Sequence, residues 1–187
     1  MQEPIPGAPP GATSLAFGRM GQLLFRASKV SAIGGGVTFV AIVLMSIVSI
    51  VGRKLFSAPV PGDVEVLQMA AAFASASFFA YCHLNGGDVK VDFFTAKASP
   101  ATVHRLDAFG SLFVGLFGAV ITWRAAVGAL AIKEAGETSM ILGWPVWMAQ
   151  MLMVPGFLLL ALAGFYMVGL HWRLSHSADA SHNGVAA

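Results

Sequence analysis

Long apolar segments alternate with short polar stretches along most of the chain. Four such segments carry no acidic or basic side chain in their central turns: residues 30–52, 64–82, 100–132 and 145–172. An α-helix rises about 1.5 Å per residue, so about 20 apolar residues cross roughly 30 Å of hydrocarbon. The pattern therefore predicts an all-α membrane protein with four transmembrane helices and short interfacial amphipathic helices.

The two ends of the chain differ in composition from the apolar segments. Residues 1–13 are rich in proline and glycine and hold few apolar side chains, which favours disorder. Residues 15–29 repeat basic and polar side chains at helical spacing. This fits either a basic amphipathic helix on the membrane surface or a frayed lead-in to the first span. We therefore divide the chain into a disordered tail with a basic amphipathic lead-in over residues 1–29, a four-span membrane domain over 30–173 and a disordered tail over 174–187.

A charged, proline-rich turn separates the first two apolar segments. Pro59, Pro61 and Gly62 cannot continue a helix, so the chain leaves one span and enters the next. Arg53 closes the first span and Glu65 opens the second. Across a tight turn these two side chains could form an ion pair, or each could be solvated separately in the headgroup layer.

Small residues form strips along the second and third segments. In lipid, side chains of this size let two helix backbones approach closely; the alternative is that the strips simply face lipid. We expect close helix packing at both strips. Their residues are Ala70 and Ala74 in the second segment and Ser111, Gly115 and Ala119 in the third.

The loop before the fourth segment, together with two prolines, shapes the last hairpin. Glu137 and Ser139 lie in this loop, and Pro145, followed by Trp147, starts the last helix at the membrane interface. Pro155 lies inside the segment, where its ring removes a backbone hydrogen bond and favours a kink. We therefore count these residues among the candidate structural or partner-contact positions.

Composition indicates a membrane environment, and the distribution of charge indicates on which side of the membrane the termini lie. Hydrophobic residues make up 57% of the chain and charged residues 11%, and the mean hydropathy is +0.76, which is outside the range of ordinary soluble domains. The net charge of +2 gives no indication of nucleic-acid binding. Seven basic residues fall on the side of the two termini and four on the other side, which favours cytoplasmic termini for a protein in contact with membrane lipids. The seven are Arg19, Arg26, Lys29, Lys90, Lys97, Arg105 and Arg173, and the four are Arg53, Lys54, Arg124 and Lys133.

The spans lack the residues that transport or catalysis requires. A protein that moves an ion or an acid normally places ionisable side chains near the bilayer midplane. Here the cores of the first, second and fourth spans hold none, and the core of the third holds only Arg124, toward its far end. The sequence contains no nucleophile-and-base pair, phosphate loop or zinc-ligand spacing. We therefore expect no enzymatic activity, cofactor or metal site, and assign no role to His104, His176 or His182.

Two other histidines leave a redox function open. His83 and His171 end the second and fourth spans on the same side, where they could serve as axial haem ligands. A haem-binding membrane anchor of a redox complex is therefore the alternative interpretation. A self-contained transporter, in which Pro155 opens a helix around a ligand, is a further rival.

The order of local features carries a family resemblance over about residues 30–173. The features are Arg53, Phe56, Pro59, Pro61 and Glu65 around the first turn, His83 and Val91-Asp92 after the second span, Gly136, Ser139, Pro145 and Trp147 before the last span, and Pro155-Gly156 within it. This arrangement resembles the small membrane subunit, often called the DctQ type, of tripartite ATP-independent periplasmic (TRAP) transporters.

The resemblance implies that this chain is a non-enzymatic partner and that another chain carries out the transport. In such transporters a periplasmic solute-binding protein captures an organic anion, and a large DctM-type membrane subunit carries the sodium-coupled machinery. The small subunit packs beside the large one as a scaffold, which implies that this chain lies in a bacterial inner membrane. This would explain why the spans are empty of ionisable groups, while the transported acid would not be encoded in this chain.

Overall fold

The computed structural model describes residues 18–88 and 100–185, and within these ranges the chain is helical apart from its turns. The described part contains no strand, and all four helices are long and apolar enough to cross a membrane, so the predicted fold class is confirmed. The helices are α1 (Arg19–Phe56), α2 (Asp63–Leu84), α3 (Pro100–Ala135) and α4 (Val146–Val185).

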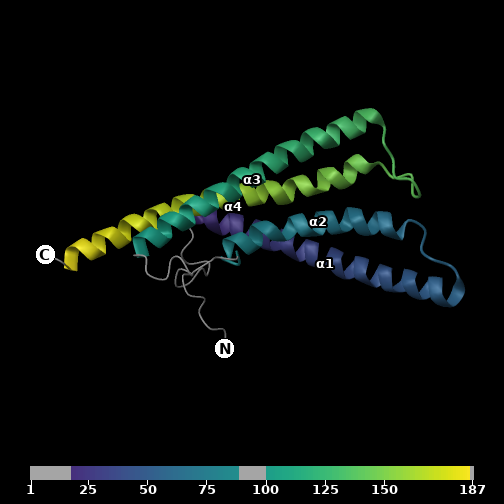
Figure 1. Cartoon of the computed structure of the whole chain (residues 1–187), viewed down its shortest axis with the longest axis horizontal. Helices are drawn as coiled ribbons and strands as arrows, with labels where there is room; N and C mark the ends of the chain where they lie inside the picture. Colours follow the sequence, from purple (N-terminus) through teal and green to yellow (C-terminus); the bar gives the residue numbers. More distant parts are fainter. Residues whose placement is uncertain (1–17, 89–99, 186–187) are drawn as a thin grey trace.

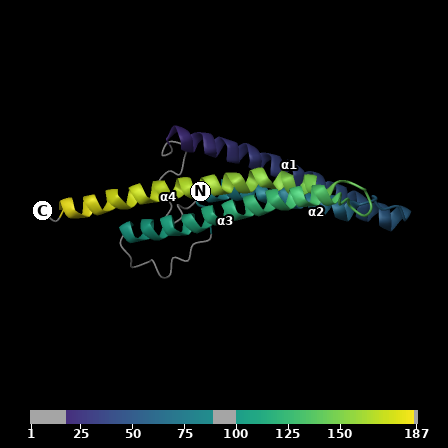
Figure 2. The same cartoon turned by 90° about the horizontal axis from the view of Figure 1, so that it is seen from above.

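The helices form two hairpins that meet along part of their length. Helix α1 packs against α2, and α3 packs against α4. The hairpins touch mainly through α2 and α4, and they diverge toward the end that carries the turn 57–62 and the loop 136–145 (Figure 1). Seen from above, the helices overlap at this end, and α1 and α3 spread apart at the other (Figure 2). Both short connections therefore lie at one end of the molecule, as expected for four consecutive membrane crossings.

Small residues set the contact between the hairpins. Gly156 of α4 lies so close to α2 that a Cβ atom there would come within 2.6 Å of the Ala76 carbonyl oxygen. Because the backbones meet here, the side chains on either side can interlock into a continuous apolar core. This core contains Ala76, Ala80, Leu84, Phe157, Leu160, Ala163 and Met167.

Helix α1 packs against the opposite side of the small-residue strip on α2. A Cβ atom at Gly35 would lie 2.9 Å from both the Ala74 carbonyl oxygen and the Ser77 Cβ atom. Ala74 is completely buried, whereas Ala70, one turn earlier, lines an apolar groove. The alanine-rich part of α2 thus faces two neighbouring helices instead of lipid.

The strip on α3 is used within its own hairpin. A Cβ atom at Gly164 of α4 would lie 2.5 Å from the Gly115 backbone and 2.9 Å from the Ser111 carbonyl oxygen. Gly118 makes a similar approach to Ala161. Ala119 is only partly buried, so the closest contacts follow Ser111, Gly115 and Gly118.

Two helices extend beyond the predicted spans. The described part of the basic lead-in, from Arg19, is continuous with α1 and forms no separate interfacial helix. At the other end α4 continues to Val185, where we expected a disordered tail from residue 174. Where α4 passes the start of α3, His171 and Ser175 are each 2% exposed, and His171 lies against His104 and Asp107 of α3. Residues 1–17, which include the whole predicted disordered tail over residues 1–13, lie outside the described part.

Candidate functional site

A left-handed turn joins α1 to α2 at the loop end of the molecule. Ser57 ends α1 with φ 52°, and Gly62 precedes α2 with φ 71°. Gly62 is also covered by the Leu142 side chain, which a Cβ atom at Gly62 would meet at 2.5 Å. Glycine is therefore required here both by its φ angle and by the approach of the second hairpin.

Arg53 pairs with Asp63 and not with Glu65, so the proposed Arg53–Glu65 pair is wrong. The Arg53 guanidinium donates to Asp63 Oδ2 at 3.2 Å, and the Ser49 hydroxyl donates to the same oxygen. The Val60 amide in turn donates to Ser49 Oγ at 3.3 Å. Asp63 and Glu65 are two residues apart on α2 and therefore face different sides of the helix. Asp63 faces α1, whereas Glu65 faces the other hairpin.

We expect Asp63→Ala to destabilise the first hairpin more than Arg53→Ala does. The Arg53 side chain is 61% exposed, and exposed ion pairs contribute little, so its loss should lower Tm by less than about 2 °C. Asp63 also accepts the bond from Ser49, which is 1% exposed. Thermal unfolding of the purified chain in detergent measures both variants. An effect of Arg53→Ala equal to that of Asp63→Ala would show that the ion pair, and not the Ser49 contact, dominates.

Glu65 connects the two hairpins at the loop end. Its Oε1 accepts a hydrogen bond from the Ile141 amide at 2.9 Å, and its Oε2 accepts one from the Leu142 amide at 3.1 Å. A carboxylate that accepts two backbone N–H groups holds a loop more firmly than a neutral acceptor can. Together with the contact between Leu142 and Gly62, these bonds form what we call the loop junction.

The loop 136–145 has its own internal hydrogen bonds. The Ser139 amide donates to the Trp144 carbonyl oxygen at 2.8 Å, and the Trp144 amide donates to Ser139 Oγ at 3.2 Å. Gly136 and Gly143 take positive φ angles of 67° and 66°, which side-chain-bearing residues rarely adopt. Glu137 is exposed, and its carbonyl oxygen accepts from the Val146 amide. Ser139 is thus a structural residue of the loop.

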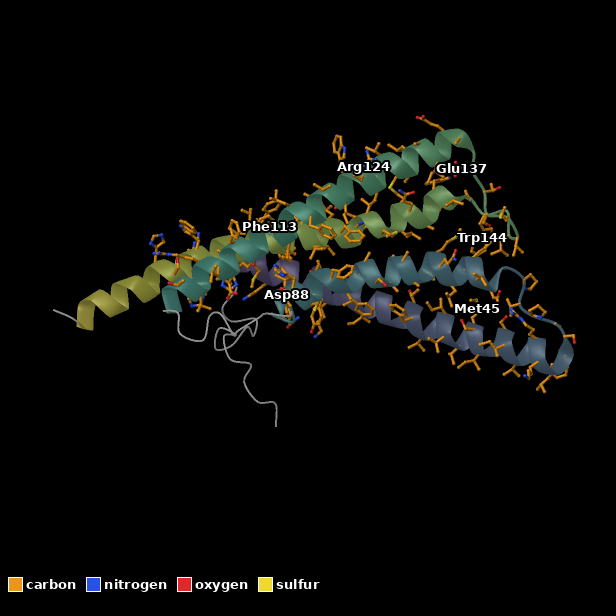
Figure 3. The ribbon with its side chains drawn as sticks, in the orientation of Figure 1. Met45, Asp88, Phe113, Arg124, Glu137 and Trp144 are labelled. Atoms are coloured by element: carbon orange, nitrogen blue, oxygen red, sulfur yellow. The ribbon has the colours of Figure 1, made fainter. Side chains whose placement is uncertain are left out.

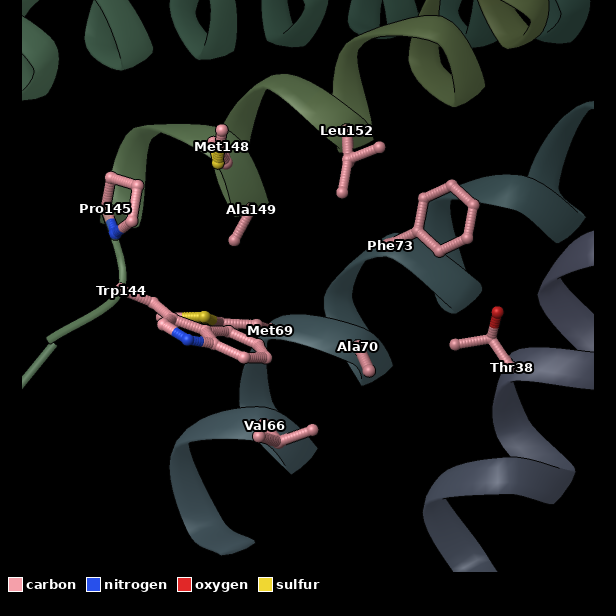
Figure 4. Close-up of a pocket in the computed structure, with 10 residues that line it drawn as sticks. All are labelled: Thr38, Val66, Met69, Ala70, Phe73, Trp144, Pro145, Met148, Ala149 and Leu152. Atoms are coloured by element: carbon pink, nitrogen blue, oxygen red, sulfur yellow. The ribbon is translucent and has the colours of Figure 1, made fainter. Parts of the chain in front are cut away.

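An apolar groove of about 530 Å³ opens between the hairpins next to the loop junction (Figure 4). Trp144 reaches over it toward Met69, and Pro145 closes its end. Its only side-chain hydroxyl belongs to Thr38, and this hydroxyl donates to the Gly34 carbonyl oxygen. The groove therefore offers shape and apolar surface, and no charged side chain lines it. It is lined by Thr38, Val66, Met69, Ala70, Phe73, Trp144, Pro145, Met148, Ala149 and Leu152.

Apolar side chains are also exposed at the tip of the loop. Met140 is 99% exposed, and Ile141 and Trp144 are more than half exposed. Trp147 lies further along, with the Lys133 ammonium 5.0 Å from its ring centre. Side chains of this kind at a helix end contact headgroups or another protein.

Charged side chains of the described segments lie toward helix ends, with Arg124 as the deepest, exposed on the outer side of α3 (Figure 3). Between Glu65 and His83 on α2, and between Val146 and Leu170 on α4, the sequence has none. Pro155 is accommodated within a single helix, one residue before the contact of Gly156 with α2. The described helices can hold one another together, and these central parts of α2 and α4 carry no ionisable side chain of the kind that binds an ion or an acid at the bilayer midplane.

Histidines at the other end of the molecule have different neighbours. His83 is buried on α2 and its Nδ1 forms a hydrogen bond with Asp88. His171 on α4 faces His104 and Asp107 on α3, a grouping that we had not predicted. The spacing of His104 and Asp107, one turn apart on one helix face, was a usable signal, but only the helix pairing brings His171 to them.

Comparison with known proteins gives one clear result. The family model described as "Tripartite ATP-independent periplasmic transporters, DctQ component" matches residues 42–174, which is more than half of the chain. No curated protein and no solved structure matches. The matched range takes in the first turn, the loop junction and the last three helices. The chain therefore belongs to the DctQ component family of TRAP transporters, a multi-pass membrane subunit of a transporter and not an enzyme.

Proposed function

We propose that this DctQ component is a scaffold that supports a large DctM-type permease in sodium-coupled uptake of an organic acid. TRAP systems are tripartite, so a large membrane subunit and a periplasmic solute-binding protein belong to the same system. In this proposal the solute-binding protein delivers the acid, the large subunit moves it, and the present chain supplies surface and rigidity.

The proposal rests on the observation that the Asp63 and Glu65 side chains bond to other parts of this chain. Glu65 and Asp63 hold the turn and the loop together at one end of the molecule. The closest approaches between the helix backbones are at glycine, alanine and serine, and apolar side chains fill the core around them. A chain built in this way is suited to present fixed helices to a partner.

The orientation is part of the same proposal. The distribution of basic residues favours cytoplasmic termini. Both the turn 57–62 and the loop 136–145 then face the periplasm, because the structure places them at the same end. The loop junction and the exposed Met140 would lie on the side from which the solute is delivered.

We assign the contact with the large subunit to the outer face of α1. This helix carries no charge from residue 30 to residue 52, whereas the outer side of α3 carries Arg124. Around Gly34 there is open space, so a partner helix can approach the backbone closely. The exposed apolar residues of this face include Val30, Ile33, Val37, Val40, Leu44, Ile47, Val48 and Val51.

The redox alternative finds no comparable support. His83 forms its hydrogen bond with Asp88, while His171 packs against residues of α3, so the two proposed haem ligands belong to separate local environments. The family match assigns the chain to a transporter. We therefore retain the scaffold function alone.

Co-purification with the large subunit tests the scaffold function. When both are expressed together and the large subunit is tagged, we expect this chain to remain bound through purification in a mild detergent. Val40→Trp should release it, and Val120→Trp should not; these two valines are 61% and 60% exposed, on α1 and α3 respectively. Failure of the wild-type chain to co-purify would contradict the scaffold function. The reverse pattern of the two variants would contradict only the assignment to α1.

A further inference from the structure

Two imidazoles and one carboxylate converge between α3 and α4. His104 and Asp107 lie one turn apart on α3, and His171 approaches them from α4. One potential ligand atom from each residue lies within 4.8 Å of the other two. His171 Nδ1 is 4.0 Å from Asp107 Oδ2, and the two imidazole ring centres are 5.9 Å apart.

The group is sheltered but lies near an end of the hairpin. The side chains of His171 and Asp107 are 3% and 12% exposed, and His104 is partly buried. His104 Nδ1 is buried and has no hydrogen-bond partner among the described residues. The group lies toward the start of α3, away from the loop junction (Figure 1). Partial exposure of His104 leaves room for water at one side.

Two imidazoles with one carboxylate form a donor set typical of borderline transition metals. Zn²⁺ binds histidine nitrogens and carboxylate oxygens at about 2.0–2.2 Å, which places the ligand atoms of a tetrahedral site roughly 3.4 Å apart. The present separations, which are 4.8 Å or less, therefore need to shorten by at most about 1.4 Å, which a change in side-chain rotation can supply. Mg²⁺ and Ca²⁺ prefer sites made of oxygen alone and do not suit two imidazoles.

We propose that His104, Asp107 and His171 bind a divalent transition-metal ion of the Zn²⁺ type, with water as the fourth ligand. The ion joins α3 to α4 at the end of the hairpin opposite the loop junction. Its role is structural, because its ligands come from two helices that pack against each other, and the ion would hold these helices together. The site does not depend on the scaffold function, and either can fail without the other.

Metal titration of the untagged full-length chain in detergent tests the proposal. After removal of bound metal with a chelator, the protein is titrated with Co²⁺ as a spectroscopic probe and then with Zn²⁺ by calorimetry. We expect about one Zn²⁺ per chain, and a rise in Tm on binding. His171→Ala and Asp107→Asn should weaken binding by at least about tenfold.

Two variants serve as controls, and a third replaces His171→Ala if that variant does not fold. His176→Ala and Cys82→Ser remove exposed potential ligands outside the group and should leave binding unchanged. If His171→Ala fails to fold, His104→Gln, at a partly exposed position, takes its place. Absence of stoichiometric binding to the wild-type chain, or binding that all three ligand variants retain, would overturn the proposal.

Discussion

Replacing Gly156 with valine should separate the two hairpins and lower the stability of the chain by about 1–3 kcal/mol. The added side chain begins 2.6 Å from the Ala76 carbonyl oxygen and 2.8 Å from its carbonyl carbon. Both are backbone atoms, so the conflict can be relieved only by moving α2 and α4 apart. The core around Phe157 and Ala80 would then lose packing on both sides. Thermal unfolding in detergent should show a decrease in Tm of roughly 2–10 °C.

Gly169→Val is the matched control for this variant. Gly169 lies on the same helix, and a Cβ atom there meets nothing within 4 Å. The control therefore includes the effect of valine on helix propensity but not the steric conflict. Equal Tm values for the two variants would mean that the α2–α4 contact is not the close crossing described here.

Glu65→Ala should release the loop 136–145 from α2. The variant loses both hydrogen bonds to the amides of Ile141 and Leu142, and the loop junction keeps only the contact between Leu142 and Gly62. We expect amide hydrogen exchange in this loop to become faster, by a factor on the order of ten. Exchange along α3 should change little, because α3 is held by its packing against α4.

Glu137→Ala is the control for the loss of a glutamate near the same loop. The Glu137 side chain is exposed, and the loop uses its backbone carbonyl, which the substitution keeps. Exchange in the loop should therefore match that of the wild-type chain. Unchanged exchange in Glu65→Ala would show that the two carboxylate bonds do not hold the loop in solution.

The four helices could be predicted because their signals are local. A run of apolar residues longer than the bilayer core, ended by Pro59 or begun by Pro100, fixes each helix to within a few residues except at the two chain ends. There, α1 begins at Arg19 and α4 continues to Val185, through residues that are outside the apolar runs. The apolar pattern that predicts a membrane span therefore gives no signal for these two extensions.

The partners of polar side chains depended on tertiary geometry instead. Arg53 had two acidic candidates two residues apart, and only the rotation of α2 about its axis decides for Asp63. Glu65 bonds to amides 76 and 77 residues away, and a backbone amide leaves no signature in the sequence. His171 meets His104 only because α3 and α4 pair antiparallel in this register.

The central claim is that this chain contributes no translocation path of its own. Proteoliposomes with an inward sodium gradient test it, with uptake of a panel of radiolabelled carboxylates as the readout. Three preparations are compared: this chain alone, the large subunit with the binding protein, and all three components together. The account predicts accumulation with all three components and none with this chain alone. Sodium-driven accumulation by this chain alone would contradict it.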